Sequence, residues 1–345
     1  MKSQLATLVL MFTTTFIFAQ ESNMKFFTTF YGSADAYYKY DFSKIDNSLS
    51  SFTNSHNSFE LGMASIEALH KMDKGSVFVD LGFGNRAAQF TYNDGIKTFI
   101  IKQLNFTYKF SDKFKVTLGS FATHVGYELV DAVDNKNYSM SYAFTYGPFF
   151  NTGIKVQYTS NKFSFMAGVS NPTDLKSTID AGSTQKTFIG QLAFLGDTGS
   201  AYFNVTSGSS NPSSDENKTQ FDFVGKKKLS KAFSLGFNGT YALTTNDLDS
   251  ALDGEWFSLV GYVNFIVKES SSVAYRLEYL DAKQATDRLG LLTGTSVIGN
   301  TLSLNYKVGN LTIIPEFRFD IASEDIFTDS NAAPKGLTAY ALLAT

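Results

Sequence analysis

Charged residues alternate with apolar residues in several stretches of this chain. This spacing is typical of β-strands that have one face in contact with water and one apolar face. Successive side chains of a β-strand point to opposite faces, so Arg318 is expected to lie opposite to Phe317 and Phe319. Ten charged residues are predicted to share such polar faces: Asp80, Arg86, Lys155, Asp222, Lys226, Arg276, Glu278, Glu316, Arg318 and Asp320. They would either solvate a water-filled interior and pair across strands, or form a ring that selects ions, weakly because both signs occur.

Residue types for most catalytic and metal sites are missing or badly placed. The chain has no cysteine, which excludes disulfides, thiolate metal sites and cysteine nucleophiles. Its three histidines, His56, His70 and His124, lie in no triad-like or metal-binding motif. The net charge of -3 includes no basic block of the kind that binds nucleic acid. We therefore expect no enzyme, no catalytic, cofactor-binding or metal site, and no nucleic-acid partner.

From Phe30 onward, apolar residues recur with a period of two, which predicts strands rather than helices. The composition agrees, because 34 Phe and 18 Tyr favour strands and only 5 Pro interrupt them. The predicted strands span residues 26–40, 58–70, 75–87, 98–110, 113–124, 148–159, 162–170, 186–195, 199–207, 219–229, 232–244, 255–267, 271–281, 297–308, 310–321 and 336–345. Short turns and long polar loops alternate between them from end to end.

This alternation is typical of an up-and-down barrel, in which every second connection lies on the same rim. The fold class is predicted to be all-β: a transmembrane up-and-down antiparallel β-barrel of about 16 strands, with 14–18 allowed. A soluble sandwich or solenoid is the alternative, but its strands are typically about 5–6 residues long, and many segments here approach the roughly 9–11 residues of a tilted spanning strand. Trp256, at the start of a strand, is expected at the membrane–water boundary.

The first twenty residues have the features of a secretory signal peptide. Lys2 precedes an apolar stretch from Leu5 to Phe18, and Ala19 is a small residue suited to the position before the cleavage site. The stretch is shorter than the roughly 20 apolar residues of a membrane-spanning helix. The predicted organisation is a signal peptide at 1–20 and one outer-membrane β-barrel domain at 21–345, located in the cell outer membrane.

Residues 119–153 carry a pattern that resembles a known family. The positions that match are Gly126, Glu128, Asn135, Tyr138, Ser139, Pro148, Phe149 and Gly153. They are similar to the putative β-barrel porin family (OmpL-like, β-barrel porin-2) of Bacteroidetes-type outer membranes. The chain departs from such barrels at its end, where Tyr340 is the last aromatic residue and Thr345 closes the sequence, so the register of the final strand stays open. The resemblance implies outer-membrane lipid and the barrel assembly machinery as partners.

Loop 125–147 is the longest well-patterned loop, and by analogy with general porins we expect it to fold inward and narrow a channel. An ordinary surface loop is the alternative. The candidate pore-constriction residues are the loop acids and the basic residues that they would face: Glu128, Asp131, Asp134, Arg86, Arg276 and Arg318. The expected function is passive diffusion of ions and small polar solutes. A dedicated solute transporter, a barrel-anchored surface-binding protein and a homo-oligomer remain open.

Overall fold

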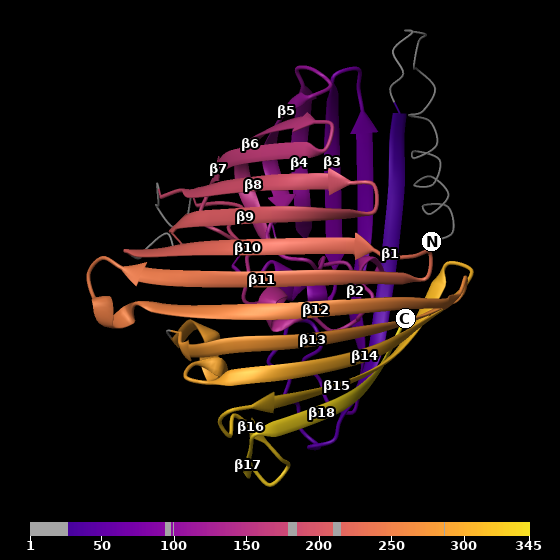
Figure 1. Cartoon of the computed structure of the whole chain (residues 1–345), viewed down its shortest axis with the longest axis vertical. Coiled ribbons are helices and arrows are strands. Elements are labelled where there is room, and N and C mark those ends of the chain that lie inside the picture. Colours follow the sequence, from indigo (N-terminus) through magenta and orange to yellow (C-terminus); the bar gives the residue numbers. More distant parts are fainter. Residues whose placement is uncertain (1–26, 94–97, 99, 179–184, 210–214, 286) are drawn as a thin grey trace, which may run out of the picture.

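Sixteen antiparallel strands close into a barrel in the part of the chain that the structure, a computed structural model, describes: residues 27–93, 98, 100–178, 185–209, 215–285 and 287–345. Neighbouring strands in the sequence are neighbours in the barrel, and β18 closes it against β1 (Figure 1). The predicted fold class is therefore confirmed. The barrel strands are β1 Phe27–Asp41, β2 Ser58–Lys71, β3 Gly75–Phe83, β4 Ile101–Lys109, β5 Phe114–Ala122, β6 Phe150–Ser160, β7 Phe163–Ser170, β8 Thr187–Gly196, β9 Gly199–Ser209, β10 Glu216–Lys228, β11 Phe233–Asn246, β12 Gly254–Lys268, β13 Ser271–Gln284, β14 Ser296–Val308, β15 Leu311–Ala322 and β18 Leu337–Ala344.

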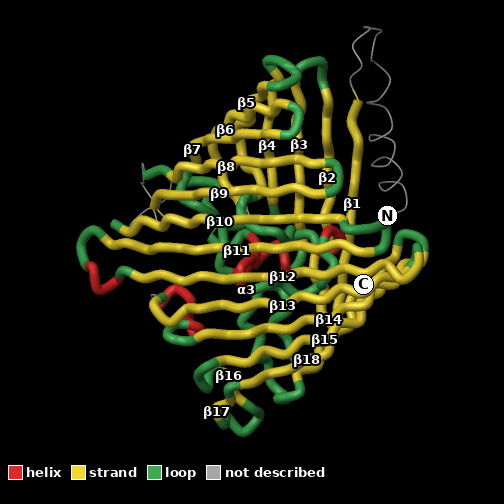
Figure 2. The backbone as a smooth tube through the Cα atoms, viewed as in Figure 1, coloured by secondary structure: helices red, strands yellow, loops and turns green. Residues whose placement is uncertain are grey.

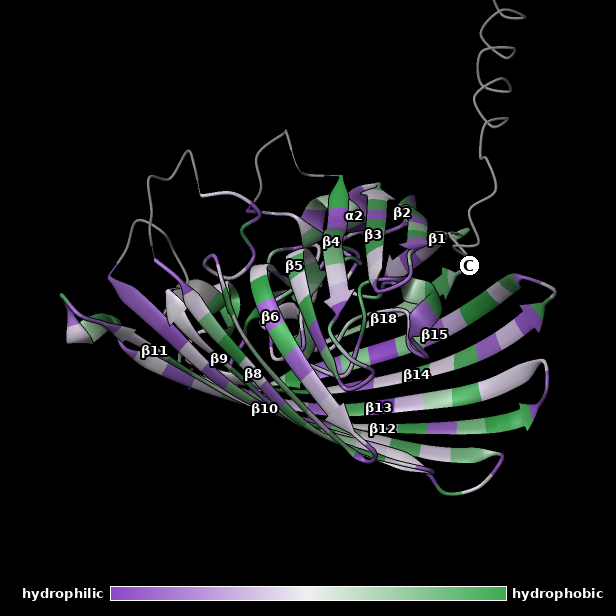
Figure 3. Cartoon of the chain, turned by 90° about the horizontal axis from the view of Figure 1, so that it is seen from above, coloured by the Kyte–Doolittle hydropathy of each residue, from purple (hydrophilic) through white to green (hydrophobic). Residues whose placement is uncertain are grey.

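The two faces of the strands are those that the alternation predicts. On β15, the Phe317 side chain is 43% exposed on the outer wall, whereas its neighbour Arg318 is 1% exposed inside. Figure 3 shows the same alternation of hydrophilic and hydrophobic residues along many strands. Register holds this arrangement in place, because a slip of one residue would move every apolar side chain to the wet face.

The predicted strand at 75–87 is wrong at its end. The strand β3 stops at Phe83, and residues Asn85–Phe90 form the short helix α2. Gly84 makes the break with φ 113°, and a Cβ there would lie 2.6 Å from the carbonyl oxygen of Gly62. Only glycine adopts that conformation at that distance without strain. As a result, Arg86 lies on a helix inside the barrel instead of on the sheet.

The connections divide the barrel into two rims. Strands β4 and β5 are joined by a turn at 110–113, and the other short turns lie on the same rim, which we call the short-turn rim. The long loops lie on the opposite, long-loop rim. The first residues of β1 pair with the end of β2 beside a short turn, and Ala344 of β18 pairs with Tyr37 of β1. The final strand thus has a defined register, and the predicted signal peptide at 1–20 lies outside the described residues.

Helical segments in the described residues are short and lie in the loops. They are α2, α3 Tyr142–Thr145, and the 3-10 segments η1 Ala132–Asp134, η2 Ser250–Leu252 and η3 Asp287–Leu292; the two-residue strands β16 Phe327–Thr328 and β17 Pro334–Lys335 form a small hairpin. Figure 2 shows α3 behind β11 and β12, within the barrel. None of the helices in the described part of the chain is both long and apolar enough to cross a bilayer.

The predicted location of Trp256 is wrong. Its side chain is 5% exposed and packs inside the barrel with Tyr142, Leu280 and Leu292. The alternation along β12 explains this position, since Phe257 and Leu259 take the outer face. Trp256 is therefore part of the interior that positions the loop described next.

Candidate constriction loop and lumen

The connection between β5 and β6, loop 123–149, runs through the barrel interior. The ring nitrogen Nε2 of His124 lies 2.9 Å from the carbonyl oxygen of Val205 on β9, and the amide of Gly126 donates to Asp222 on β10 (3.1 Å). The Tyr127 ring then stacks on Tyr262 of β12, with centroids 4.0 Å apart. The loop thus crosses from β5 to the opposite wall, and the predicted inward fold of 125–147 agrees with its geometry.

Arg276 of β13 is the main anchor of this loop. Its guanidinium donates to Glu128 Oε1 at 2.8 Å and to the carbonyl oxygen of Ser139 at 2.5 Å. Its Nε lies 3.2 Å from Glu278 on the same strand. The Arg276 side chain is fully buried. Buried guanidinium groups need such partners, because an isolated buried charge is costly.

Arg318 of β15 is the second anchor. It donates to Asp320 at 2.9 Å and to the carbonyl oxygen of Met140 at 2.7 Å, and its guanidinium lies over the Tyr142 ring. The backbone amide of Tyr142 donates to Glu278 (2.7 Å) and its hydroxyl to Asp320 (2.7 Å). The start of α3 is therefore fixed to β13 and β15, the two strands on either side of β14, by charge-assisted hydrogen bonds.

The other loop acids have different partners from those predicted. Asp131 accepts two hydrogen bonds of 2.7 Å from Lys102 of β4. Period two alone would place Lys102 on the same face as Leu104, so the sequence did not indicate it as an inward charge. An irregularity in the pairing of β3 with β4 beside it turns Lys102 inward. Arg86 binds backbone carbonyl groups of the loop, and its guanidinium donates to the carbonyl oxygen of Val130 (3.1 Å). Asp134 is exposed and forms no ion pair among the described residues. Of the six candidates, only Glu128 and Arg276 pair directly with each other.

These geometries change the interpretation of the arginines. Arg86, Arg276 and Arg318 are 0%, 0% and 1% exposed, so they do not face water in this arrangement. They bind the loop to the wall. The alternation of charged and apolar residues in the sequence can identify charges that point inward. It cannot distinguish charges in buried ion pairs from charges exposed to water in the lumen.

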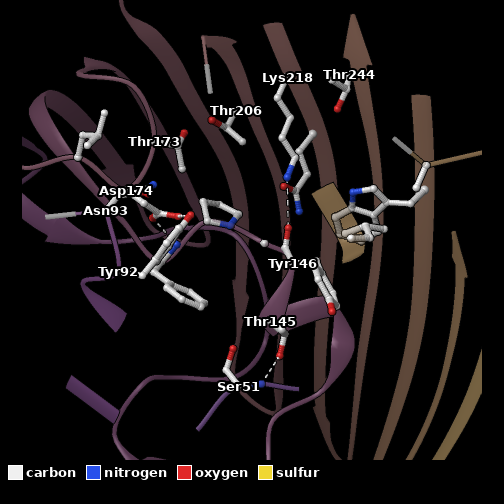
Figure 4. Close-up of a pocket in the computed structure, with 18 of the residues that line it drawn as sticks. Ser51, Tyr92, Asn93, Thr145, Tyr146, Thr173, Asp174, Thr206, Lys218 and Thr244 are labelled. Carbon is white, nitrogen blue, oxygen red and sulfur yellow. Dashed lines mark hydrogen bonds between the residues drawn. The ribbon is translucent and has the colours of Figure 1, made fainter. Parts of the chain in front are cut away.

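An outer cavity of about 770 Å³ lies above the loop, toward the long-loop rim. Figure 4 shows Tyr92, Asp174, Tyr146 and Lys218 around it, with Thr206 and Thr244 on the barrel wall. Lys218 of β10 donates to the carbonyl oxygen of Tyr146 at 3.3 Å and lies over the Trp256 ring. Its lining combines aromatic rings and hydroxyl groups with few charged side chains.

Asp174 fixes the end of loop 123–149 beside this cavity. One carboxylate oxygen accepts hydrogen bonds from the amides of Phe149 (2.7 Å) and Phe150 (2.9 Å), and the other accepts one from Tyr92 (3.1 Å). Burial raises the pKa of Asp174 to about 6, and the hydrogen bonds oppose this effect only in part. This group therefore gains or loses its charge in the range between pH 5 and 7.

A smaller inner cavity of about 150 Å³ lies on the short-turn side of the loop, between Tyr127, Lys136 and the wall residues Lys226 and Asn264. The two cavities have no lining residue in common. Between them, Ala143 of α3 packs against Val260 and Tyr262 of β12, and Asp222 is held by Asn204 and Asn238. We call the section of the lumen at these contacts the narrow layer. Its main residues are Ala143, Val260 and Tyr127.

Comparisons with known proteins agree with this architecture. The family described as "Putative beta-barrel porin-2, OmpL-like" matches residues 28–345. No curated protein sequence matches the chain. Among solved structures, an anion-selective porin from Comamonas acidovorans superposes with a TM-score of 0.62 at 10% identity, over 93% of this chain and 99% of that one.

Two further structures share the barrel. A loop-deletion mutant of OmpT, an outer membrane protein of Vibrio cholerae, gives a TM-score of 0.61 at 12% identity, covering 92% of this chain and 98% of that one. The outer membrane channel DcaP of Acinetobacter baumannii gives 0.56 at 11% identity, with 92% and 96% covered. At these identities the likeness extends to the fold alone. The family match carries the assignment, and the chain belongs to the β-barrel porin-2, OmpL-like family.

Proposed function

We propose that this porin-family barrel lets ions and small polar solutes diffuse passively across the outer membrane, and that loop 123–149 forms its constriction. The observation that carries the proposal is the position of the loop between the outer and inner cavities. A solute on its way from one rim to the other would have to pass the narrow layer at Ala143 and Val260. The candidate residues then divide into two roles: Glu128, Asp131 and the three arginines hold the loop, and Asp134 faces the passage.

A dedicated solute channel is the second candidate. The outer cavity is large enough for a small organic molecule, and it combines aromatic rings with hydroxyl and amide groups. Such a lining would favour solutes whose shape and hydrogen-bonding groups match it, whereas a general porin selects mainly by size. Saturation of the current by one solute would favour this alternative.

The surroundings of the barrel follow from the same proposal. A signal peptide at 1–20 would direct the chain to export, and assembly machinery would insert it into a Bacteroidetes-type outer membrane. The outer wall carries exposed Phe, Tyr and Leu side chains that suit contact with lipid. The short-turn rim would then face the periplasm. A homo-oligomer would be formed through part of the same outer wall.

Planar-bilayer recording tests the function directly. The purified full barrel, refolded in detergent, should insert and give discrete current steps in KCl. Folding is verified separately, because intact barrels migrate differently on gels before and after boiling. A folded, inserted barrel that conducts no ions would contradict the proposal. Native protein recovered from the soluble periplasm without detergent would contradict the membrane location.

A further inference from the structure

Three lysines form a ladder on the inner wall near the short-turn rim: Lys109 of β4, Lys115 of β5 and Lys155 of β6. Their outward neighbours fix the direction in which they point. Tyr108, Leu118 and Ile154 are 37%, 58% and 47% exposed on the outer face. The alternation of strand side chains therefore places the three lysines on the lumen side.

Register brings these lysines together. Lys109 is the direct cross-strand partner of Lys115. Lys155 is paired with Thr117, two residues along from Lys115 on the same face, and so lies diagonal to it. Directly opposite side chains have Cβ atoms about 5 Å apart and diagonal ones about 7–8 Å apart. Like charges at these positions repel each other and destabilise the sheet.

A second like-charge pair in this lumen shows how such repulsion is normally relieved. Glu67 of β2 is the direct partner of Asp80 of β3, and their carboxylates gather with that of Asp131. Lys102 lies among them, 3.0 Å from Asp80 and 2.7 Å from Asp131. This acidic cluster thus has a counter-charge supplied by the protein.

The lysine ladder has no such counter-charge in the described residues. No carboxylate there forms an ion pair with Lys109, Lys115 or Lys155, and Asp112 at the tip of the adjoining turn is exposed and forms none either. Lys155 is nevertheless held in position, because its ammonium lies 3.8 Å from the centroid of the buried Phe121 ring. The described part of the chain therefore leaves room for a counter-charge from solution.

We propose that this ladder is a binding station for small anions that carry phosphate or carboxylate groups, and that it gives the channel a preference for anions. The proposal rests on the channel function proposed above. Positive side chains that line a pore raise the local concentration of anions and lower that of cations. Lipid headgroups are not the ligand, since the ladder points into the lumen.

Selectivity is the first test. In a KCl gradient across a planar bilayer, the parent should show a reversal potential of the sign expected for chloride preference. The double variant Lys115→Gln/Lys155→Gln should lower the chloride-over-potassium permeability ratio by about threefold. Lys227→Gln is the matched control, because Lys227 is at the same rim but on the outer face of β10, and it should behave like the parent. A conducting parent without anion preference, or an equal effect of the control, overturns the proposal.

The second test does not depend on conductance. Lysines of the folded barrel, in neutral detergent without phospholipid, are acetylated with and without inorganic phosphate and are measured individually by mass spectrometry. Phosphate should slow the modification of Lys115 and Lys155 by about threefold or more and leave Lys227 unchanged. If phosphate changes the acetylation rates of all three lysines by the same factor, or changes none of them, anion binding by the ladder is overturned even if the barrel conducts. Protection in a barrel that fails to conduct would instead support the station and contradict the channel.

Discussion

Arg276 and Glu128 are 148 residues apart in the sequence, yet their side chains meet at 2.8 Å inside the barrel, where they are 0% and 4% exposed. One belongs to the wall and the other to loop 123–149. Each also bonds to the loop segment at Ser139–Ser141. The pair therefore connects both halves of the loop to β13.

Removing one member of this pair should weaken the barrel. Glu128→Gln leaves the buried Arg276 with one carboxylate fewer, and breaking a buried ion pair typically costs about 3–5 kcal/mol. The urea midpoint of the refolded barrel should fall accordingly. Glu269→Gln, in an exposed turn, is the matched control and should change stability by less than about 0.5 kcal/mol. Equal midpoints for both variants would mean that the pair does not hold the loop.

Asp174 should give the barrel a specific pH dependence. Its pKa is about 6 in the folded barrel, against about 3.9 in an unfolded chain, so between these values the folded state binds more protons. The contribution of this group to the free energy of unfolding therefore falls as pH rises from about 4 to about 6, by up to about 3 kcal/mol. Asp174→Asn keeps an oxygen for the two amides but cannot ionise. The parent-minus-variant difference in stability should change over this range, and a constant difference would contradict the raised pKa.

The sequence predicts the barrel well and its interior less well. Alternation along a strand depends on local residues, so Phe317 and Arg318 are assigned to the correct faces. The break at Gly84 cannot be predicted from the neighbouring residues, because its cause is a close approach to Gly62 on another strand. Likewise, the pairing of Asp131 with Lys102 depends on how a long loop crosses the lumen, which no local pattern specifies.

Trp256 provides an optical test of the interior. Because the indole packs against Tyr142 and Leu292 inside the barrel, its fluorescence should resist quenching by brominated lipid at any depth. Tyr142→Ala should expose it, and quenching by aqueous acrylamide should increase by about twofold or more because the cavity admits the quencher. Strong quenching of the parent by lipid would place the residue on the outer wall instead.

Neighbouring residues on β6 report the two faces of the wall. Ile154→Cys should be protected by lipid, whereas Lys155→Cys should react with a water-soluble thiol reagent, since the native chain has no cysteine to interfere. The expected difference in rate is about tenfold or more, because thiolates form in water and not in hydrocarbon. The opposite order would mean a register error of one residue, and the lysine ladder would then face lipid.

The central claim is that loop 123–149 sets the narrowest section of a water-filled channel, and single-channel conductance tests it most directly. Val260→Ala removes two methyl groups from the contact with Ala143, and deletion of 129–137 removes the segment that holds Lys102 and Arg86. Both variants, once shown to fold, should conduct more than the parent. The first removes atoms from the narrow layer, and the second removes chain that lines the inner cavity beside it. Leu259→Ala, on the outer face of the same strand, should conduct like the parent. Parent-like conductance in both folded loop-layer variants would contradict the claim.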